Sequence, residues 1–148
     1  MFPIAMCAAF ELNSRMIRPG RWVGVWRERG EDHHIWAGFA RREVLGWWKR
    51  KGGELVDIPA DRFAERSDLD RQLRWEDIPK GHVMRGIIDP NDGKPLLKVL
   101  TRASTQEEQV RYQHPRMPVV EVSLFNSIPV TPMREPEPDG QPAQGELF

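Results

Sequence analysis

The chain has 148 residues, which is the size of one ordinary domain and leaves little room for a second independent core. Lysine plus arginine equals aspartate plus glutamate at 22 each, so the chain has no overall basic field, and any nucleic-acid site must be a local patch. A single cysteine cannot form an internal disulfide, which favours a reducing, cytoplasmic location. The apolar run at residues 1–10 has no basic start and ends at Glu11, so we expect neither a signal peptide nor a membrane-spanning helix.

The spacing of apolar residues is mostly that of β-strands. We expect strands at residues 7–12, 21–26, 34–39, 54–58, 82–88, 96–101 and 119–124. The turn residues DPNDG at 89–93 predict a hairpin between two of these strands. Residues 41–51 and 104–112 favour helix, the second with Ser104 as its N-cap and Glu107 three residues later. Together, these expected strands and helices predict an α+β fold: a β-rich single domain with a few short helices.

The composition changes near Pro129. Residues 129–148 contain five prolines and several acids, with almost no bulky apolar residue before Leu147 and Phe148. Such a segment cannot bury enough apolar surface to offset the entropy lost on ordering. We therefore expect a folded domain at residues 6–128 and a disordered, proline-rich tail at 129–148.

Six tryptophans are many for a chain of this length. Most are expected in the core, because tryptophan buries a large apolar area. The alternative is that one or two form a stacking platform for exposed bases. Trp22 and Trp26 share a face of their predicted strand, and Trp22 is our candidate for a contact with DNA.

Three segments, in order along the chain, resemble motifs of one protein family. Residues 6–10 read MCAAF, residues 58–65 read IPADRFAE, and residues 114–119 read HPRMPV. They are similar to Met-Cys-Gly-Arg-Phe, Ile-Pro-Ala-Asp-Gly-Phe-Tyr-Glu and His-Asp-Arg-Met-Pro-Val of the SOS response-associated peptidase (SRAP) family. A weaker match at residues 40–43, ARRE, is similar to the family's Ala-Arg-Ala-Glu. The matches span most of residues 6–120 and suit a divergent, shortened member.

The resemblance implies an SRAP-like fold, with its strands in a barrel-like sheet, and a role in DNA damage. Proteins of this family capture abasic sites in single-stranded DNA as DNA-protein crosslinks, and their mature chain begins with the cysteine, here Cys7. A free α-amine beside a thiol first forms an imine with an aldehyde and then closes a thiazolidine ring. An α-amine titrates at about pH 8, which leaves a useful neutral fraction for attack.

The resemblance also assigns the other roles. Glu65 would move protons as the carbinolamine becomes the imine. His114 would assist opening of the sugar ring or stabilise the imine. Arg41 and Arg116 would hold phosphates. The reaction needs no cofactor, and the histidines and Cys7 lack the spacing of metal ligands.

As numbered, Cys7 follows Met6 and five further residues, so its nitrogen is an amide and cannot form an imine. We expect translation to start at Met6, with the methionine then removed. Alternatively, the chain acts as its own cysteine peptidase and cuts after Met6, as the family name implies. The first route is favoured. If residues 1–6 remain, we expect no covalent or lyase-type activity.

Departures from the family pattern keep other hypotheses open. Ala9 stands where the family has arginine, and Phe39 stands where it has asparagine. Arg66 and Pro115 replace a tryptophan and an aspartate. Ala9 and Phe39 favour a non-covalent single-stranded DNA-binding module on the same fold. A third hypothesis is a phage or plasmid accessory protein that uses the scaffold for partner binding.

The last five residues, QGELF, resemble the short C-terminal peptides by which bacterial repair proteins dock on the sliding clamp. Gln144, Leu147 and Phe148 would be the anchors, carried on a flexible tether. The alternative is a polar tail without a partner.

Overall fold

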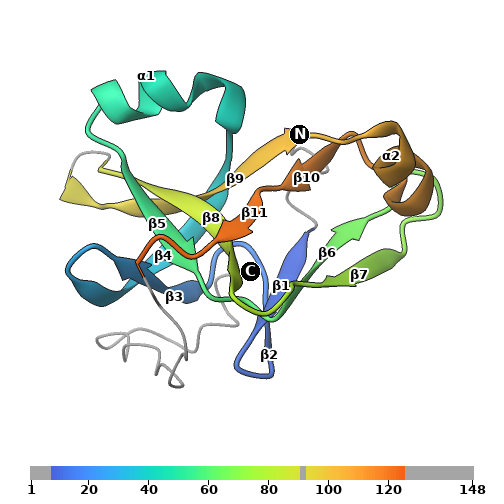
Figure 1. Ribbon diagram of the computed structural model, residues 1–148, viewed down its shortest axis with the longest axis horizontal. Coiled ribbons are helices and arrows are strands. Elements are labelled where there is room, and N and C mark those ends of the chain that lie inside the picture. The colour runs from blue at the N-terminus through green and yellow to red at the C-terminus, as the bar shows by residue number, and fades with distance from the viewer. Residues whose placement is uncertain (1–7, 91–92, 126–148) are drawn as a thin grey trace.

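Strands dominate residues 8–90 and 93–125, which are the residues that the computed structural model describes (Figure 1). The strands are β1 (Ala9–Leu12), β2 (Arg15–Ile17), β3 (Trp22–Arg27), β4 (Gly30–Arg41), β5 (Glu54–Ile58), β6 (Arg62–Arg66), β7 (Leu73–Asp77), β8 (His82–Asp89), β9 (Leu96–Ala103), β10 (Arg116–Pro118) and β11 (Val120–Val122). The 3-10 helix η2 (Arg42–Val44) leads into the α-helix α1 (Leu45–Arg50), and α2 (Gln106–Tyr112) precedes β10. The described residues thus form one β-rich domain with two short α-helices.

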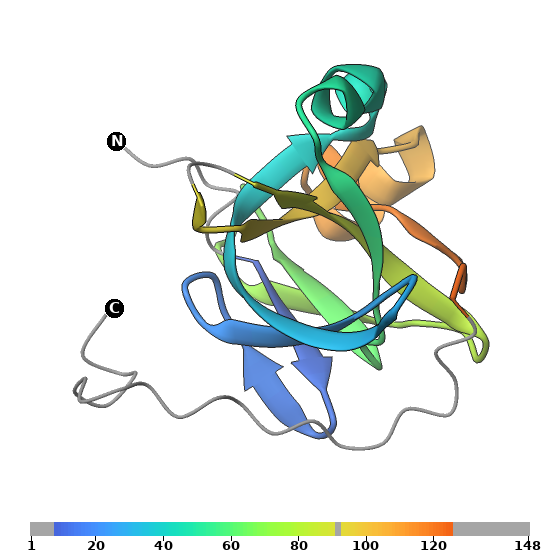
Figure 2. The same cartoon turned by 90° about the vertical axis from the view of Figure 1, so that its left-hand side faces the viewer.

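The strands pair in two sheets. The smaller has the order β2-β1-β6-β7 and the larger the order β10-β9-β4-β3-β5-β8-β11. Strand β8 also pairs with β9, so the pairings β9–β4, β4–β3, β3–β5, β5–β8 and β8–β9 return to the strand at which they begin. Within these sheets β4 and β9 run parallel and the other pairs antiparallel. Figure 2 shows β4 curving along one side of this ring of pairings.

A bulge in β4 redirects the end of that strand. Its register against β9 shifts between Trp36 and Phe39. Gly38, inside the shift, has a φ of 107°, a value that glycine adopts without the steric cost of a Cβ atom. The indole N–H of Trp36 donates to the Gly38 carbonyl at 3.0 Å, and Lys98 Nζ donates to the Ala37 carbonyl at 2.8 Å. The bulge therefore sets the direction in which Phe39 and the following residues leave the sheet.

The main core draws side chains from both sheets. Trp36 is the largest fully buried side chain, and its ring lies 4.9 Å from that of Phe10, between centroids. Burial of each such side chain stabilises the fold by about 1.5–3 kcal/mol. A smaller cluster of Ala40, Ile87, Leu100 and Val119 is covered by Leu45 and Trp48 of the helical segment, together with Leu55. This cluster attaches α1 to the larger sheet.

All seven predicted strands form, with ends shifted by a few residues, and β8 and β9 form the predicted hairpin. Four further strands, β2, β6, β7 and β10, were not predicted. Strands β2 and β10 have three residues each, too few for a period to show. Strand β6 buries both of its faces, including a glutamate, so it does not alternate.

Both helix predictions need correction. The predicted helix at 41–51 begins later, because β4 continues through Arg41 and a 3-10 turn precedes α1. The N-cap of α2 is Thr105 and not Ser104: the Thr105 hydroxyl accepts from the Glu108 N–H, and Glu108 accepts from the Thr105 N–H. The Ser104 hydroxyl instead donates to the His114 carbonyl. The predicted domain end at 128 and the tail at 129–148 lie outside the described residues.

A buried ion pair joins the last described strand to the centre of the larger sheet. Asp57 is fully buried and accepts from the Arg85 guanidinium, from Ser123 Oγ at 2.7 Å and from the Phe125 N–H at 3.1 Å. Arg85 also donates to the Val122 carbonyl at 2.8 Å. Because these partners belong to β5, β8 and the chain around β11, the pair fixes where the chain leaves the sheet.

We predict that Asp57→Ala lowers the free energy of unfolding by about 3–5 kcal/mol, because it removes the buried partner of Arg85 and leaves this buried charge with the half-exposed Glu121 as its remaining ion-pair partner. Urea unfolding followed by tryptophan fluorescence measures the change. Asp70→Ala is the matched control, since the Asp70–Arg74 pair lies at the surface and should matter far less. Equal losses for the two variants would contradict this assignment.

Candidate functional site

A cavity of about 330 Å³ lies where the end of β4 meets β6, β9 and the segment that enters β10. We call it the site cavity. It is lined by Phe39, Arg41, Glu65, Thr101, His114, Pro115 and Arg116. Four of the residues predicted to act together, Arg41, Glu65, His114 and Arg116, are thus gathered at one place from distant parts of the sequence.

Glu65 is a buried carboxyl group at the wall of this cavity. It lies on β6, and only 3% of its surface is exposed. Burial disfavours the charged form and raises the pKa of Glu65 to about 8, and the negative charge of Asp68 adds to this effect. At neutral pH the group is therefore mostly a neutral acid. It can donate a proton to a substrate and take one back.

The turn after α2 places His114. Gln113 ends the helix with a left-handed backbone, and the Ser104 hydroxyl donates to the His114 carbonyl at 2.8 Å. The ring atom Nδ1 lies 2.8 Å from the Arg116 carbonyl oxygen and 3.1 Å from the Arg116 nitrogen. These contacts fix the ring with its other nitrogen, Nε2, 3.6 Å from Oε1 of Glu65.

The separation between Glu65 and His114 defines what the pair can do. A distance of 3.6 Å is longer than a hydrogen bond, so neither group fully satisfies the other. A polar atom that enters the cavity can therefore contact both groups. A neutral acid next to an imidazole, both 6% exposed or less, is an arrangement suited to general acid–base catalysis.

The two arginines of the cavity differ in their partners. Arg116 donates twice to the Glu43 carboxylate, at 2.8 Å each, and to the Thr101 carbonyl at 2.9 Å. Its guanidinium holds the pKa of the exposed Glu43 carboxyl at about 2. Arg41 is exposed at the end of β4. An incoming phosphate would thus meet Arg41 directly but would compete with Glu43 for Arg116.

Of the remaining predicted site residues, only Trp22 is described, and it does not line this cavity. Cys7 lies outside the described residues, as do Gln144, Leu147 and Phe148 of the predicted clamp peptide. Trp22 is half-buried on β3 and lines a separate small hollow with Leu12, Ile17 and His33.

The start of the described chain lies beside the strand that carries Glu65. Ala8, the first described residue, is 4% exposed. Ala9, the next residue, pairs with Ala64 of β6. Continuing this antiparallel register by one residue would set Ala8 opposite Glu65.

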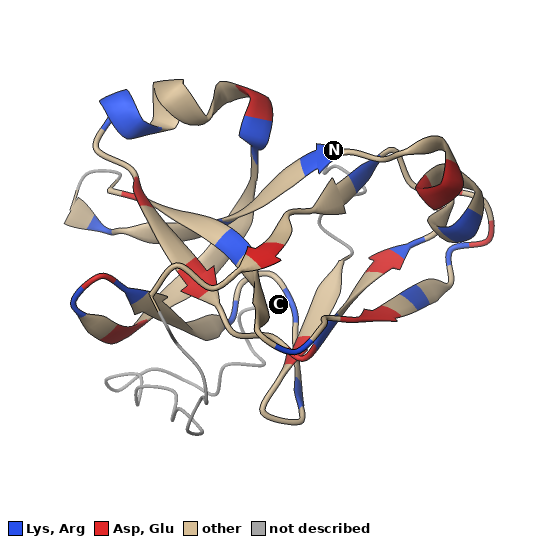
Figure 3. Cartoon of the chain, viewed as in Figure 1, with Lys and Arg blue, Asp and Glu red and all other residues tan. Residues whose placement is uncertain are grey.

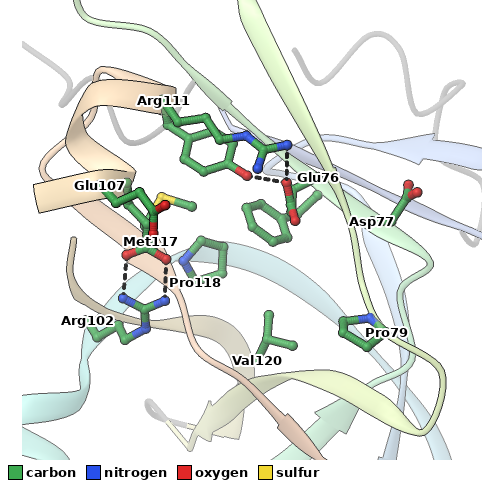
Figure 4. A pocket seen from close by; sticks show the side chains of 12 residues that line it. Glu76, Asp77, Pro79, Arg102, Glu107, Arg111, Met117, Pro118 and Val120 are labelled. Carbon is green, nitrogen blue, oxygen red and sulfur yellow. Dashed lines mark hydrogen bonds and ion pairs between the residues drawn. The ribbon is translucent and has the colours of Figure 1, made fainter. Parts of the chain in front are cut away.

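A second cavity, of about 320 Å³, lies between α2, β7 and β10 (Figure 4). Its rim is charged: Arg102 forms two hydrogen bonds of 2.7 Å to Glu108, and Glu76 accepts from Tyr112 and pairs with Arg111 at 3.0 Å. Its floor is formed by Phe63, Met117, Pro118 and Val120. Among the described residues, no serine or histidine lines it, so the imidazole of the expected chemistry has no counterpart here.

The sequence did not reveal the part that Glu43 plays. Its place in the ARRE match was visible, but its pairing with Arg116 depends on the meeting of η2 with β10 in space. Thr101 was missed for the same reason, because it contacts Arg116, which is distant in the sequence. Asp68, whose charge acts on Glu65, was missed because it lies beyond the IPADRFAE motif.

No protein-family model, curated protein or solved structure matches this chain. Within residues 8–90 and 93–125, no three metal-ligating side chains stand close enough to hold an ion together. None of the helices in this part of the chain has the length and apolar character needed to cross a membrane.

The raised pKa of Glu65 predicts a pH-dependent stability. The folded protein holds the Glu65 proton up to about pH 8, whereas the unfolded chain releases it at about 4.3. The free energy of unfolding should therefore fall as pH rises through this window and level off above it. Each unit of pKa shift corresponds to about 1.4 kcal/mol. Glu65→Gln should remove this part of the slope, as measured by urea unfolding at about pH 5 and about pH 9. Parallel pH profiles for the two proteins would refute the prediction.

Proposed function

We propose that this chain is an SRAP-like protein that captures abasic sites in single-stranded DNA through a thiazolidine at Cys7. The observation that carries the proposal is the buried Glu65–His114 pair at the wall of a cavity, 3.6 Å apart. The family resemblance implies a barrel-like sheet, and we include this architecture in the proposal. The closed series of strand pairings is compatible with it.

The proposed reaction forms two bonds and releases one water. The α-amine of Cys7 attacks the aldehyde carbon of the open abasic sugar and gives a carbinolamine. Glu65, as a neutral acid, protonates the hydroxyl group, which leaves as water, and the Glu65 carboxylate takes the proton of the nitrogen as the imine forms. The thiol then adds its sulfur to the imine carbon, and its proton goes to the nitrogen. The product is a five-membered thiazolidine ring.

The position of Ala8 supports the reach of Cys7 to this pair. Consecutive Cα atoms are about 3.8 Å apart, so Cys7 is one peptide unit from a buried residue beside β6. The amine is free only if residues 1–6 are absent, through a start at Met6 or through cleavage after Met6. The proposal can therefore be tested by comparing proteins that begin at Cys7 with proteins that retain residues 1–6.

Phe39 favours a second candidate, a non-covalent single-stranded DNA module. It lines the site cavity, and its ring stands edge-on to Trp36, 5.7 Å away between centroids. An apolar wall of this kind can contact a base or sugar without any covalent step. On this hypothesis the protein holds the DNA but forms no bond to it.

The crosslinking prediction compares proteins that begin at Cys7. Incubated with single-stranded DNA carrying one abasic site, the protein should form an adduct that survives heat and denaturing electrophoresis. Cys7→Ala should form none. Glu65→Gln should slow formation about 100-fold or more, because it removes the proton donor. Glu107→Gln, which changes an exposed acid on α2, is the matched control and should leave the rate unchanged. Binding without an adduct would support the non-covalent candidate.

A second prediction concerns Glu43. Glu43→Gln should strengthen binding of undamaged single-stranded DNA by about two- to tenfold, because it releases Arg116 and removes a charge that repels phosphate. Fluorescence anisotropy of a labelled oligonucleotide measures the change. Glu31→Gln, an exposed acid at the start of β4, controls for net charge. Weaker binding by the Glu43 variant would argue against a phosphate at Arg116.

A further inference from the structure

The segment that leaves the site cavity carries a dense positive charge. Residues 41–51 contain five cationic side chains, Arg41, Arg42, Lys49, Arg50 and Lys51, against one carboxylate, that of Glu43. All five cations are exposed. Figure 3 shows basic residues at both ends of this helical segment. In a chain with no net charge, this is a local basic patch, and we call residues 41–51 the basic strip.

Little of this charge is neutralised within the protein. Glu43 pairs with Arg116, and Arg42 lies 3.6 Å from Glu121. Among the described residues, Arg41, Lys49 and Arg50 take part in no ion pair, and Lys51 lies over the rings of Trp47 and Trp48. The strip therefore presents cations to solvent, where a polyanion can reach them.

The two adjacent tryptophans of α1 have different surroundings. Trp48 is half-buried and packs on the second core cluster, which attaches the helix to the sheet. Trp47 is 47% exposed, which is unusual for so large an apolar ring. Its ring stands edge-on to Trp48 at 5.0 Å between centroids, and Lys51 Nζ lies 4.4 Å from its centroid. Trp47 is thus held in place while much of its surface remains open.

We propose that the basic strip binds the single-stranded DNA that continues from the abasic nucleotide, with phosphates on its cations and a base stacked on Trp47. The proposal rests on the function proposed above for the presence of DNA in the site cavity. Arg41 belongs to both the cavity wall and the strip, so the two surfaces are continuous. At 1.5 Å per residue, the six residues of α1 extend about 9 Å, comparable with two or three stacked nucleotides.

A nucleic acid suits this surface better than a membrane does. A membrane-surface helix needs a broad apolar face. Here Leu45 and Trp48 face the protein core, which leaves Trp47 and Val44 as the exposed large apolar side chains of the strip. Clustered cations beside an open aromatic ring are features by which proteins hold single strands without reading their sequence.

The test uses the full chain with an undamaged, fluorescently labelled 20-nucleotide single strand and measures anisotropy across a salt series. The variant K49Q/R50Q/K51Q should bind about tenfold more weakly at 0.1 M salt. Its log–log salt slope should be shallower by about 2, since each phosphate contact in a single strand contributes about 0.7. Trp47→Ala should weaken binding at least fivefold with an unchanged salt slope. R18Q/R29Q/K80Q removes the same charge from exposed positions elsewhere and should bind like the wild type.

The outcomes separate this inference from the proposed function. If the basic-strip and control variants bind alike while the wild type still crosslinks abasic DNA, the inference is overturned and the proposed function stands. If the strip variants lose affinity but no protein forms an adduct, the strip is supported and covalent capture fails. Binding of wild-type protein to phosphatidylglycerol vesicles with no affinity for the oligonucleotide would overturn the inference in favour of a membrane surface.

Discussion

The approach of Glu65 to His114 is the constraint on which the candidate site depends. Glu65 belongs to the smaller sheet, and His114 lies on the segment that leads into β10 of the larger one, so their 3.6 Å separation exists only when the two sheets meet correctly. Burial at this junction keeps the carboxyl group neutral to about pH 8. The same packing that forms the main core thus keeps this carboxyl group protonated, and the proposed chemistry depends on that proton.

Charge is distributed around this junction in a way that suits its proposed task. The buried acid is neutral and does not repel DNA, while the cations of the cavity and of residues 41–51 lie outside it. Glu43 reduces this positive charge, because its carboxylate pairs with the Arg116 guanidinium. At the second cavity, acidic and basic side chains instead pair with one another: Glu108 with Arg102, and Glu76 with Arg111.

Most of the strands could be predicted from the sequence, because apolar and polar residues alternate clearly in them. The prediction missed strands in which the buried residues do not follow this alternation. Strand β6 carries Glu65 between two flanking strands, and a buried acid has no signature in a hydrophobic pattern. Arg41, Glu65, His114 and Arg116 came from motif order, and the structure brings them to one cavity. Trp22 was selected as an aromatic residue that could stack on bases, and it lies elsewhere. The Gly38 bulge and the Glu43–Arg116 pair depend on contacts between distant segments, which periodicity cannot reveal.

The central claim is a covalent bond from the first residue of the mature chain to an abasic sugar, and intact-mass spectrometry tests it most directly. Protein that begins at Cys7, incubated with an abasic oligonucleotide without any reductant, should give one species whose mass is the sum of both partners less one water. Peptide mapping should place the bond at Cys7. A complex that dissociates to the two unmodified masses, or a bond mapped to a lysine, would contradict the account.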